Sequence, residues 1–274
     1  GTPIARIETE TGAPAHIKPL TRENPGEPVI SGLTTGSSPA LAGGSARRDS
    51  ADWSRTCLVA AVASRRGSRI VENSEIAALS PDWDAADIAK RTGIERRPWV
   101  TQGESVLSLA VDAARASLET AGVGIEDISM IIFATGTPSS TTPSMAALLQ
   151  YELSAGEAVT CPAYDINAAC AGYIYGLQQA WDFLSNSPDG LVLLLTSEVL
   201  SPRLDMHDAG TAPIFGDAAT ATILGGATSQ LADGAVASVD RPVLAAKGES
   251  GAALRVPAEQ AAPVLQDGSA TVLA

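Results

Sequence analysis

The sequence predicts an α/β protein built around a mainly parallel sheet. Strand and helix patterns alternate from residue 57 to about residue 200, as they do in successive βαβ units. Residues 191–196 form an apolar run with no polar face, which is typical of a parallel strand covered by helices on both sides. Alanine and glycine are abundant, and aromatic residues make up only 4% of the chain. Small residues suit the close packing of helices on a sheet.

The elements follow one another at the spacing expected of such a fold. The first is a buried strand over 57–63, and short helical segments are predicted over 70–91. The later predictions are a helix over 104–121 stopped by Gly122, a strand over 128–135, a helix opened by Pro143 and running to 153, a strand over 163–168, a helix over 173–184 and strands over 191–196, 219–224 and 235–239.

The chain divides into two parts of different character. Residues 1–52 are rich in Gly, Pro, Ser and Thr and show no sustained period, so they are predicted to be a disordered tail or linker. Residues 53–274 are predicted to form one folded unit. The sequence begins with glycine instead of methionine, and we therefore expect processing or truncation.

Composition excludes several functional classes. The formal net charge of −13 disfavours nucleic-acid binding, which needs basic groups to neutralise phosphates. The longest apolar runs are too short to cross a membrane, and the start of the chain lacks the pattern of a signal peptide. The three cysteines and two histidines show no zinc spacing, so no metal site is expected. We expect a soluble protein in a reducing, cytoplasmic setting.

Basic residues are concentrated in one short stretch of this acidic chain. They are Arg65, Arg66, Arg69, Lys90, Arg91, Arg96 and Arg97. Two interpretations stay open, a solvated face or a surface that steers a phosphate-bearing or acidic partner.

Cys170 is the candidate nucleophile. It lies in the segment 164–173, where a predicted strand runs through small residues into a predicted helix. A side chain there opens toward the crevice in which α/β proteins bind ligands, and the helix N-terminus favours a thiolate and an oxyanion. The alternative is a small buried cysteine that packs like alanine. Cys57 and Cys161 fit that alternative, since one lies in an apolar run and the other precedes a proline.

Several segments together resemble β-ketoacyl-[acyl carrier protein] synthase III. The central one is Ala168-Ala-Cys-Ala-Gly172 followed by Tyr173. The others, in the family's order, are Arg91-Thr-Gly-Ile94, Thr135-Gly-Thr-Pro138, Pro143-Ser-Met-Ala146, Thr196-Ser-Glu-Val-Leu200 and Phe215-Gly-Asp-Ala-Ala219. Together they cover about residues 57–274, and several ordered matches are a stronger signal than any one.

The resemblance implies a thiolase-like fold, layered αβαβα, of which this chain supplies mainly the first α/β half. It implies that Cys170 forms an acyl-enzyme with a thioester of coenzyme A or of a carrier-protein phosphopantetheine, with no permanently bound cofactor. The acyl group then enters a decarboxylative Claisen condensation, as in fatty-acid or polyketide biosynthesis, or passes to another acceptor. Arg91 and Thr92 would lie at the mouth of the tunnel that admits the pantetheine arm. The implied partners are an acyl carrier protein or acyl-CoA, and a second copy or a chain carrying the second half.

The chain departs from the family in its missing histidine and asparagine, which the second half supplies. A fragment, a split enzyme or a non-catalytic relic would each explain this absence. His207 is the candidate substitute. If the strands before Cys170 and before His207 were adjacent and parallel, His207 would approach Cys170, and Asp205 or Asp208 would orient it. The alternative is a surface-loop histidine.

Two further departures concern the acyl donor. Asp87 occupies the position where the family tends to carry a tryptophan that stacks on adenine, and Ala209 stands where it tends to carry an arginine. Both favour an acyl carrier protein as donor, or a specialised acyltransferase, over tight coenzyme A binding.

Three functions therefore compete. The first is an enzyme that transfers acyl groups through Cys170. The second is a non-catalytic half-thiolase subunit that completes another chain's site, and the third is a cysteine hydrolase that uses His207. An isolated half should also expose a large apolar face, so we expect poor solubility or oligomers.

Overall fold

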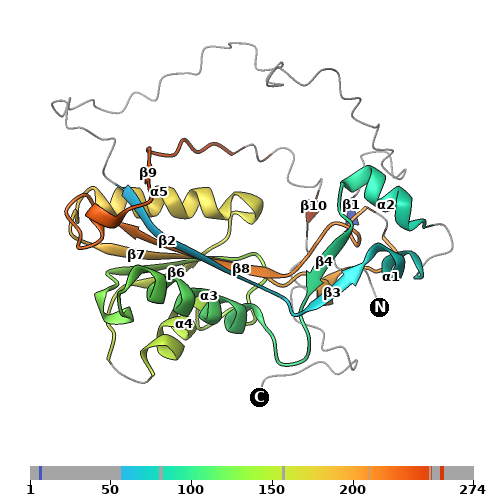
Figure 1. Cartoon of the computed structure of the whole chain (residues 1–274), viewed down its shortest axis with the longest axis horizontal. Coiled ribbons are helices and arrows are strands. Elements are labelled where there is room, and N and C mark those ends of the chain that lie inside the picture. The colour runs from blue at the N-terminus through green and yellow to red at the C-terminus, as the bar shows by residue number, and fades with distance from the viewer. Residues whose placement is uncertain are drawn as a thin grey trace, which may run out of the picture.

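The computed structural model describes residues 6–7, 57–79, 83–155, 158–208, 210–246, 248 and 254–255. A six-stranded sheet forms the centre of this part of the chain (Figure 1). Its strands, in spatial order, are β6 (Ala163–Ile166), β5 (Met130–Ala134), β7 (Leu191–Glu198), β8 (Ala218–Gly225), β2 (Cys57–Arg66) and β9 (Ala237–Val239).

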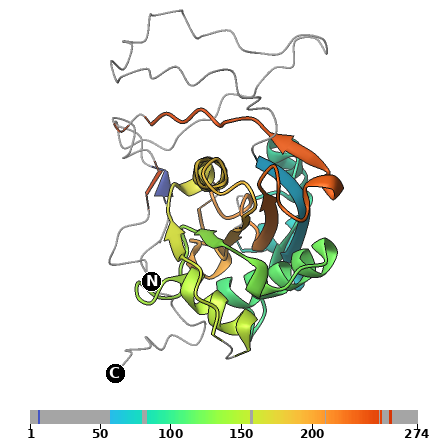
Figure 2. The same cartoon turned by 90° about the vertical axis from the view of Figure 1, so that its left-hand side faces the viewer.

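Helices cover both faces of the sheet. α3 (Val106–Ala121) and α4 (Met145–Ser154) pack on one face, and α5 (Gly172–Leu184) packs on the other (Figures 1 and 2). Alternate residues of β7 belong to the two separate apolar cores on either side. This confirms the prediction of a strand buried on both faces, and it explains the unbroken apolar run of β7.

The sheet is mixed, so the prediction of a mainly parallel sheet was partly wrong. β5 pairs in parallel with β6 and β7, but β8 is antiparallel to both β7 and β2, and β9 is antiparallel to β2. The sequence signal failed because β2 and β8 are apolar strands like the others, and apolarity does not encode direction. The described part of the chain has the three layers expected of a thiolase-like half.

One edge of the sheet collects the carboxyl ends of four strands. β5, β6 and β7 run in one direction. β2 runs the same way, because Ala218 of β8 is paired with both Glu198 and Arg66. The residues that follow β2, β5, β6 and β7 therefore all leave the sheet at this edge, which we call the carboxyl edge.

A small subdomain lies beyond the carboxyl edge (Figure 1). It consists of the antiparallel pair β3 (Arg69–Glu72) and β4 (Arg96–Trp99), with the helices α1 (Asn73–Ala77) and α2 (Ala85–Thr92) between them. Its own apolar core comprises Val71, Ile76, Ile88 and Trp99. The helical segments predicted over 70–91 are confirmed, whereas the two short strands were missed.

Asp217 joins the small subdomain to the sheet. Its carboxylate is fully buried and accepts hydrogen bonds from Val100 N (2.8 Å), Leu200 N (2.8 Å), Ser201 N (2.9 Å) and the Ser201 hydroxyl. These donors come from the end of β4 and from the segment after β7.

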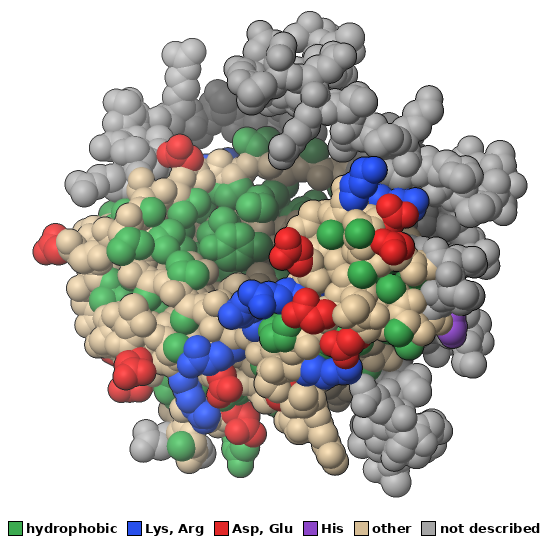
Figure 3. Space-filling model, turned by 45° about the vertical axis from the view of Figure 1, so that its right-hand side comes forward, with side chains coloured by type: hydrophobic (Ala, Val, Ile, Leu, Met, Phe, Trp, Pro, Cys, Tyr) green, Lys and Arg blue, Asp and Glu red, His purple; other side chains and the backbone are tan. Residues whose placement is uncertain are grey.

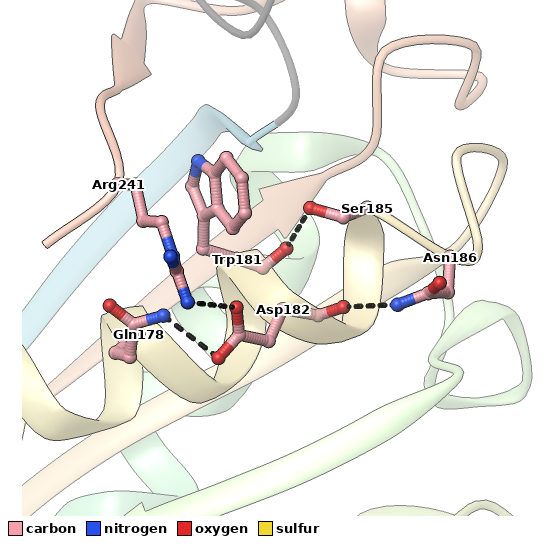
Figure 4. A network of polar contacts seen from close by, with 6 residues as sticks. All are labelled: Gln178, Trp181, Asp182, Ser185, Asn186 and Arg241. Carbon is pink, nitrogen blue, oxygen red and sulfur yellow. Dashed lines mark hydrogen bonds and ion pairs between the residues drawn. The ribbon is translucent and has the colours of Figure 1, made fainter. Parts of the chain in front are cut away.

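The segment after β9 is held against α5. The Arg241 guanidinium lies 5.4 Å from the centre of the Trp181 ring and 3.4 Å from Asp182 Oδ1 (Figure 4). Gln178 Nε2 donates to the other carboxylate oxygen of Asp182 at 2.8 Å. These contacts lead the chain from the sheet edge across the outer side of α5.

The remaining element boundaries agree with the sequence to within a few residues. Gly122 ends α3 in the left-handed conformation (φ 70°), as predicted. Pro143 does not open α4, because Ser144 is the N-cap and the helix begins at Met145. The short elements are η2 (Ile125–Asp127), η3 (Ala169–Ala171), η4 (Ser201–Arg203), η5 (Ala232–Gly234) and the paired strands β1 (Arg6–Ile7) and β10 (Leu254–Arg255).

Most of the predicted tail, residues 1–52, lies outside the described residues, as does most of the chain after residue 246. Among the described residues, no helix has the length and apolarity to span a bilayer.

We expect Asp217→Asn to lower the free energy of unfolding by at least about 2 kcal/mol, because an amide nitrogen cannot accept the buried hydrogen bonds. Urea denaturation would measure the loss. Asp233→Asn is the matched control, since Asp233 is exposed. A loss for Asp217→Asn no larger than that of the control would contradict the joining role.

Candidate functional site

Cys170 lies at the carboxyl edge, where β6 passes into α5. After Ile166 the chain makes a short turn into η3, which contains Cys170 and ends at Ala171, directly before the first residue of α5. The cysteine is exposed. The sequence predicted this strand–turn–helix junction, and the structure confirms it.

The turn before Cys170 adopts an unusual backbone conformation. Ala169 has a φ of 47°, in the left-handed region that residues with a side chain rarely occupy. The Asn167 side chain stabilises it, because its Oδ1 accepts a hydrogen bond from Ala169 N at 3.2 Å. This conformation redirects the chain from the strand into the helix and leaves Cys170 facing outward.

Glycine is needed for α5 to begin so close to the sheet. A Cβ at Gly172 would lie 3.1 Å from Ala134 Cβ, and a Cβ at Gly176 would lie 2.4 Å from Leu194 Cδ1. The small residues around Cys170 thus serve close packing of α5 on β5 and β7 as well as the sharp turn.

The three cysteines have different environments. Burial raises the pKa of the Cys57 thiol to about 12, and burial also raises the pKa of Cys161, whose sulfur accepts a hydrogen bond from Gln150 at 3.2 Å. Both thiols are therefore held protonated near neutral pH. Cys170 is the exposed cysteine of the three, as the sequence analysis expected.

A loop over residues 135–138, following β5, lies beside the Cys170 turn. Glu198, the last residue of β7, holds this loop. Its Oε1 accepts from Gly136 N at 2.6 Å, and its Oε2 accepts from the Thr137 hydroxyl at 2.7 Å. The Thr137 hydroxyl in turn accepts from Val199 N at 3.0 Å. The sequence analysis missed Glu198, although its motif, Thr-Ser-Glu, had been noted.

Burial raises the pKa of Glu198, opposed by the hydrogen bonds from Thr137 and Gly136 and by the charge of Arg203. Arg203 is itself buried, and desolvation lowers its pKa while Glu198 raises it. Its Nη2 donates to the carbonyl oxygen of Pro138 at 3.0 Å. A half-buried carboxylate and a buried guanidinium thus hold the 135–138 loop.

Asp165 fixes the next helix to the same edge. Its two carboxylate oxygens accept from Met145 N (2.7 Å) and Ala146 N (2.8 Å) at the start of α4. A carboxylate at a helix N-terminus is stabilised by the free N–H groups there. The sequence signal was an acidic residue inside a strand pattern, two residues before Asn167, and it was not used.

Arg91 and Thr92 form the last turn of α2, in the small subdomain beyond the carboxyl edge. The Thr92 hydroxyl donates to Ile88 O at 2.7 Å and accepts from Ile94 N at 3.0 Å. Arg91 is exposed, and no carboxylate within the described residues lies within 4.0 Å of its guanidinium. Their placement at the tunnel mouth stays a prediction.

His207 is exposed, and its backbone N–H donates to Asp205 Oδ1 at 3.0 Å. The strands before Cys170 and His207 are not adjacent, so this condition for a His207 role is not met, because β5 lies between β6 and β7. They are nevertheless parallel, so both loops do leave the carboxyl edge. No hydrogen bond among the described residues joins His207 to Cys170, and a catalytic role for His207 stays untested.

Comparison with known proteins identifies the relatives of this site. Residues 164–241, which include Cys170, match the family described as 3-oxoacyl-[acyl-carrier-protein (ACP)] synthase III. A β-ketoacyl-[acyl-carrier-protein] synthase III from Rhodobacter capsulatus is 38% identical over 181 residues, covering 65% of this chain and 52% of the relative. One from Rhodopirellula baltica is 42% identical over 156 residues, covering 57% of this chain and 44% of the relative.

Solved structures with a similar fold come from the same family of synthases. The priming β-ketosynthase from the R1128 polyketide pathway has a TM-score of 0.58 at 31% identity, covering 63% of this chain and 50% of that one. The 3-oxoacyl-[acyl-carrier-protein] synthase III from Aquifex aeolicus has a TM-score of 0.59 at 30% identity, covering 64% of this chain and 55% of that one. The chain spans about half the length of the relatives it matches. The resemblance suggested by the sequence is confirmed, and so is the thiolase-like fold.

At about pH 8 we expect iodoacetamide to modify Cys170 in the folded chain and to modify Cys57 far more slowly, because Cys57 is buried and only about one in 10,000 thiols with a pKa of about 12 is ionised there. Peptide mapping by mass spectrometry would measure both rates, with Cys170→Ser and the denatured chain as controls. Equal rates for the two cysteines in the folded chain would contradict the assignment.

Proposed function

Because the chain is similar to the first half of a β-ketoacyl-[acyl carrier protein] synthase III, we propose that Cys170 accepts an acyl group from a thioester. The observation that carries the proposal is an exposed cysteine at a strand-to-helix junction, inside the region that matches the family. The other two thiols are held protonated by burial, which leaves Cys170 as the one suited to nucleophilic attack.

The proposed reaction has two steps. The Cys170 thiolate attacks the thioester carbonyl carbon, a new carbon–sulfur bond forms, and the carrier leaves as its thiolate. A malonyl thioester then loses CO₂, and the resulting enolate carbon attacks the acyl group. This step releases Cys170 as a thiolate and yields a β-ketoacyl thioester. The N-terminus of α5 provides backbone N–H groups and a partial positive charge near the developing oxyanion.

An acyl carrier protein is the donor that the chain's residues favour. Asp87 is exposed on α2, where relatives tend to carry an adenine-stacking tryptophan. Arg91 remains available to a phosphate or to an acidic partner. Figure 3 shows other basic side chains over the small subdomain, among acidic ones. A coenzyme A thioester is the competing donor.

The proposal requires a second half that supplies the histidine and asparagine of the family, either from a longer chain or from a partner. Apolar side chains on the sheet-and-helix body are open to such a partner (Figure 3). Ile174 of α5 is 44% exposed and Val62 of β2 is 57% exposed. A homodimer, or a heteromer with a chain that carries the second half, would cover them.

Intact-mass spectrometry after incubation with acyl carrier protein thioesters and acyl-CoA tests the proposal. We expect the mass to increase by one acyl group in the native chain and not in Cys170→Ala, while Cys161→Ala behaves as the native chain does. An adduct that appears only after a second-half polypeptide is added would indicate a split site. If no adduct forms under either condition, acyl transfer is excluded and a non-catalytic subunit becomes the better description.

A further inference from the structure

The loop over residues 135–138 lies next to the segment that carries Cys170. Ala134, directly before the loop, has its Cβ 3.1 Å from the position a Cβ would take at Gly172. A Cβ at Gly136 would lie 3.6 Å from Glu198 Oε1 and 3.7 Å from Asn167 Oδ1. Gly136 therefore lies close to both the Glu198 carboxylate and the Asn167 side chain, and a larger residue at this position would touch both.

Asn167 is the hydrogen-bonding side chain that supports the turn. Its Oδ1 accepts from Ala169 N, and Ala169 holds the left-handed conformation that a residue with a side chain avoids. Such a conformation persists only where its surroundings fix it. The hydrogen bonds described at this turn run from Ala169 N to Asn167 Oδ1 and from Ala171 N to Ala168 O.

Glu198 determines where the loop lies. Its two carboxylate oxygens each accept one hydrogen bond, from Gly136 N and from the Thr137 hydroxyl, and Val199 N completes the ring by donating to that hydroxyl. A carboxylate can accept at both oxygens, whereas an amide has only one acceptor. Arg203 is the charged side chain whose field acts on Glu198. Partial burial of the carboxylate at the end of β7 has a desolvation cost, which these two donors offset.

We propose that Glu198 is a positioning residue for Cys170, acting through the 135–138 loop and Asn167. It holds the turn that places the Cys170 sulfur at the N-terminus of α5. The inference rests on the proposed function only in taking Cys170 as the reactive thiol. Glu198 itself touches neither the thiol nor the acyl group in this role.

The pH dependence of Cys170 alkylation tests the role, because the direction in which Glu198→Gln shifts the pH profile distinguishes two effects. If Glu198 were only a nearby negative charge, Glu198→Gln would ease thiolate formation and move the profile to lower pH. If Glu198 positions the turn, loosening it removes Cys170 from the positive end of α5. The pH of the half-maximal iodoacetamide rate then rises, by about 0.5 pH unit.

Glu104→Gln is the matched control. Glu104 likewise accepts hydrogen bonds from backbone groups, Thr101 N at 2.7 Å and Ser68 N at 3.1 Å, but no hydrogen bond among the described residues joins it to the loop or the turn. We expect it to leave the Cys170 profile unchanged. Thr137→Val, which removes the loop's hydroxyl, should raise the midpoint as Glu198→Gln does, whereas Thr137→Ser should restore the native value.

An unchanged or lowered midpoint in either folded variant, Glu198→Gln or Thr137→Val, would overturn the proposal. If Glu198→Gln shows no cooperative unfolding transition, and is therefore not folded, the comparison of Thr137→Val with Thr137→Ser tests the positioning role by itself. Alkylation needs no acyl donor. A raised midpoint in a chain that forms no acyl adduct would support the positioning role while excluding the proposed acyl transfer.

Discussion

The buried Asp217 carboxylate is the interaction on which the architecture around the site depends. It has no basic partner among the described salt bridges, and hydrogen bonds from backbone and hydroxyl groups compensate for its burial. These donors come from the end of β4 and from the segment after β7. One side chain therefore fixes the small subdomain against the edge where Cys170 opens, and the same side chain fixes the segment that leads from Glu198 to Arg203.

The carboxyl edge is organised by acidic side chains that each accept at least two hydrogen bonds, at least one of them from a backbone N–H. Asp165 holds the start of α4, Glu198 holds the 135–138 loop, and Asp217 holds the end of β4. Each lies in or next to a strand terminus at this edge and accepts from N–H groups that belong to loops or to a helix start, which the sheet does not pair. The shape of the Cys170 site is therefore determined by hydrogen bonds to carboxylates, while the apolar cores on the two faces stabilise the layers that carry it.

Much of this could be predicted from the sequence, and the failures have identifiable causes. The strand at Leu191 and the junction at Cys170 were found because apolar runs and small residues are local signals. Strand direction in the sheet was not found, since it depends on pairing between distant segments. The pairing of β3 with β4 was missed because α1 and α2 separate the two short strands. Glu198 was missed because its role arises from contacts with Gly136 and Thr137, about 60 residues earlier in the chain.

The most direct measurement is a map of where the acyl group resides. The chain, with and without a second-half polypeptide, would be exposed to an isotope-labelled acyl thioester, digested and analysed by tandem mass spectrometry, with neutral hydroxylamine used to cleave thioesters. The label is expected on the peptide that contains Cys170 and should be released by hydroxylamine. Label on Cys57 or Cys161, or no label even with the second half present, would contradict the assignment of Cys170 as the acyl acceptor.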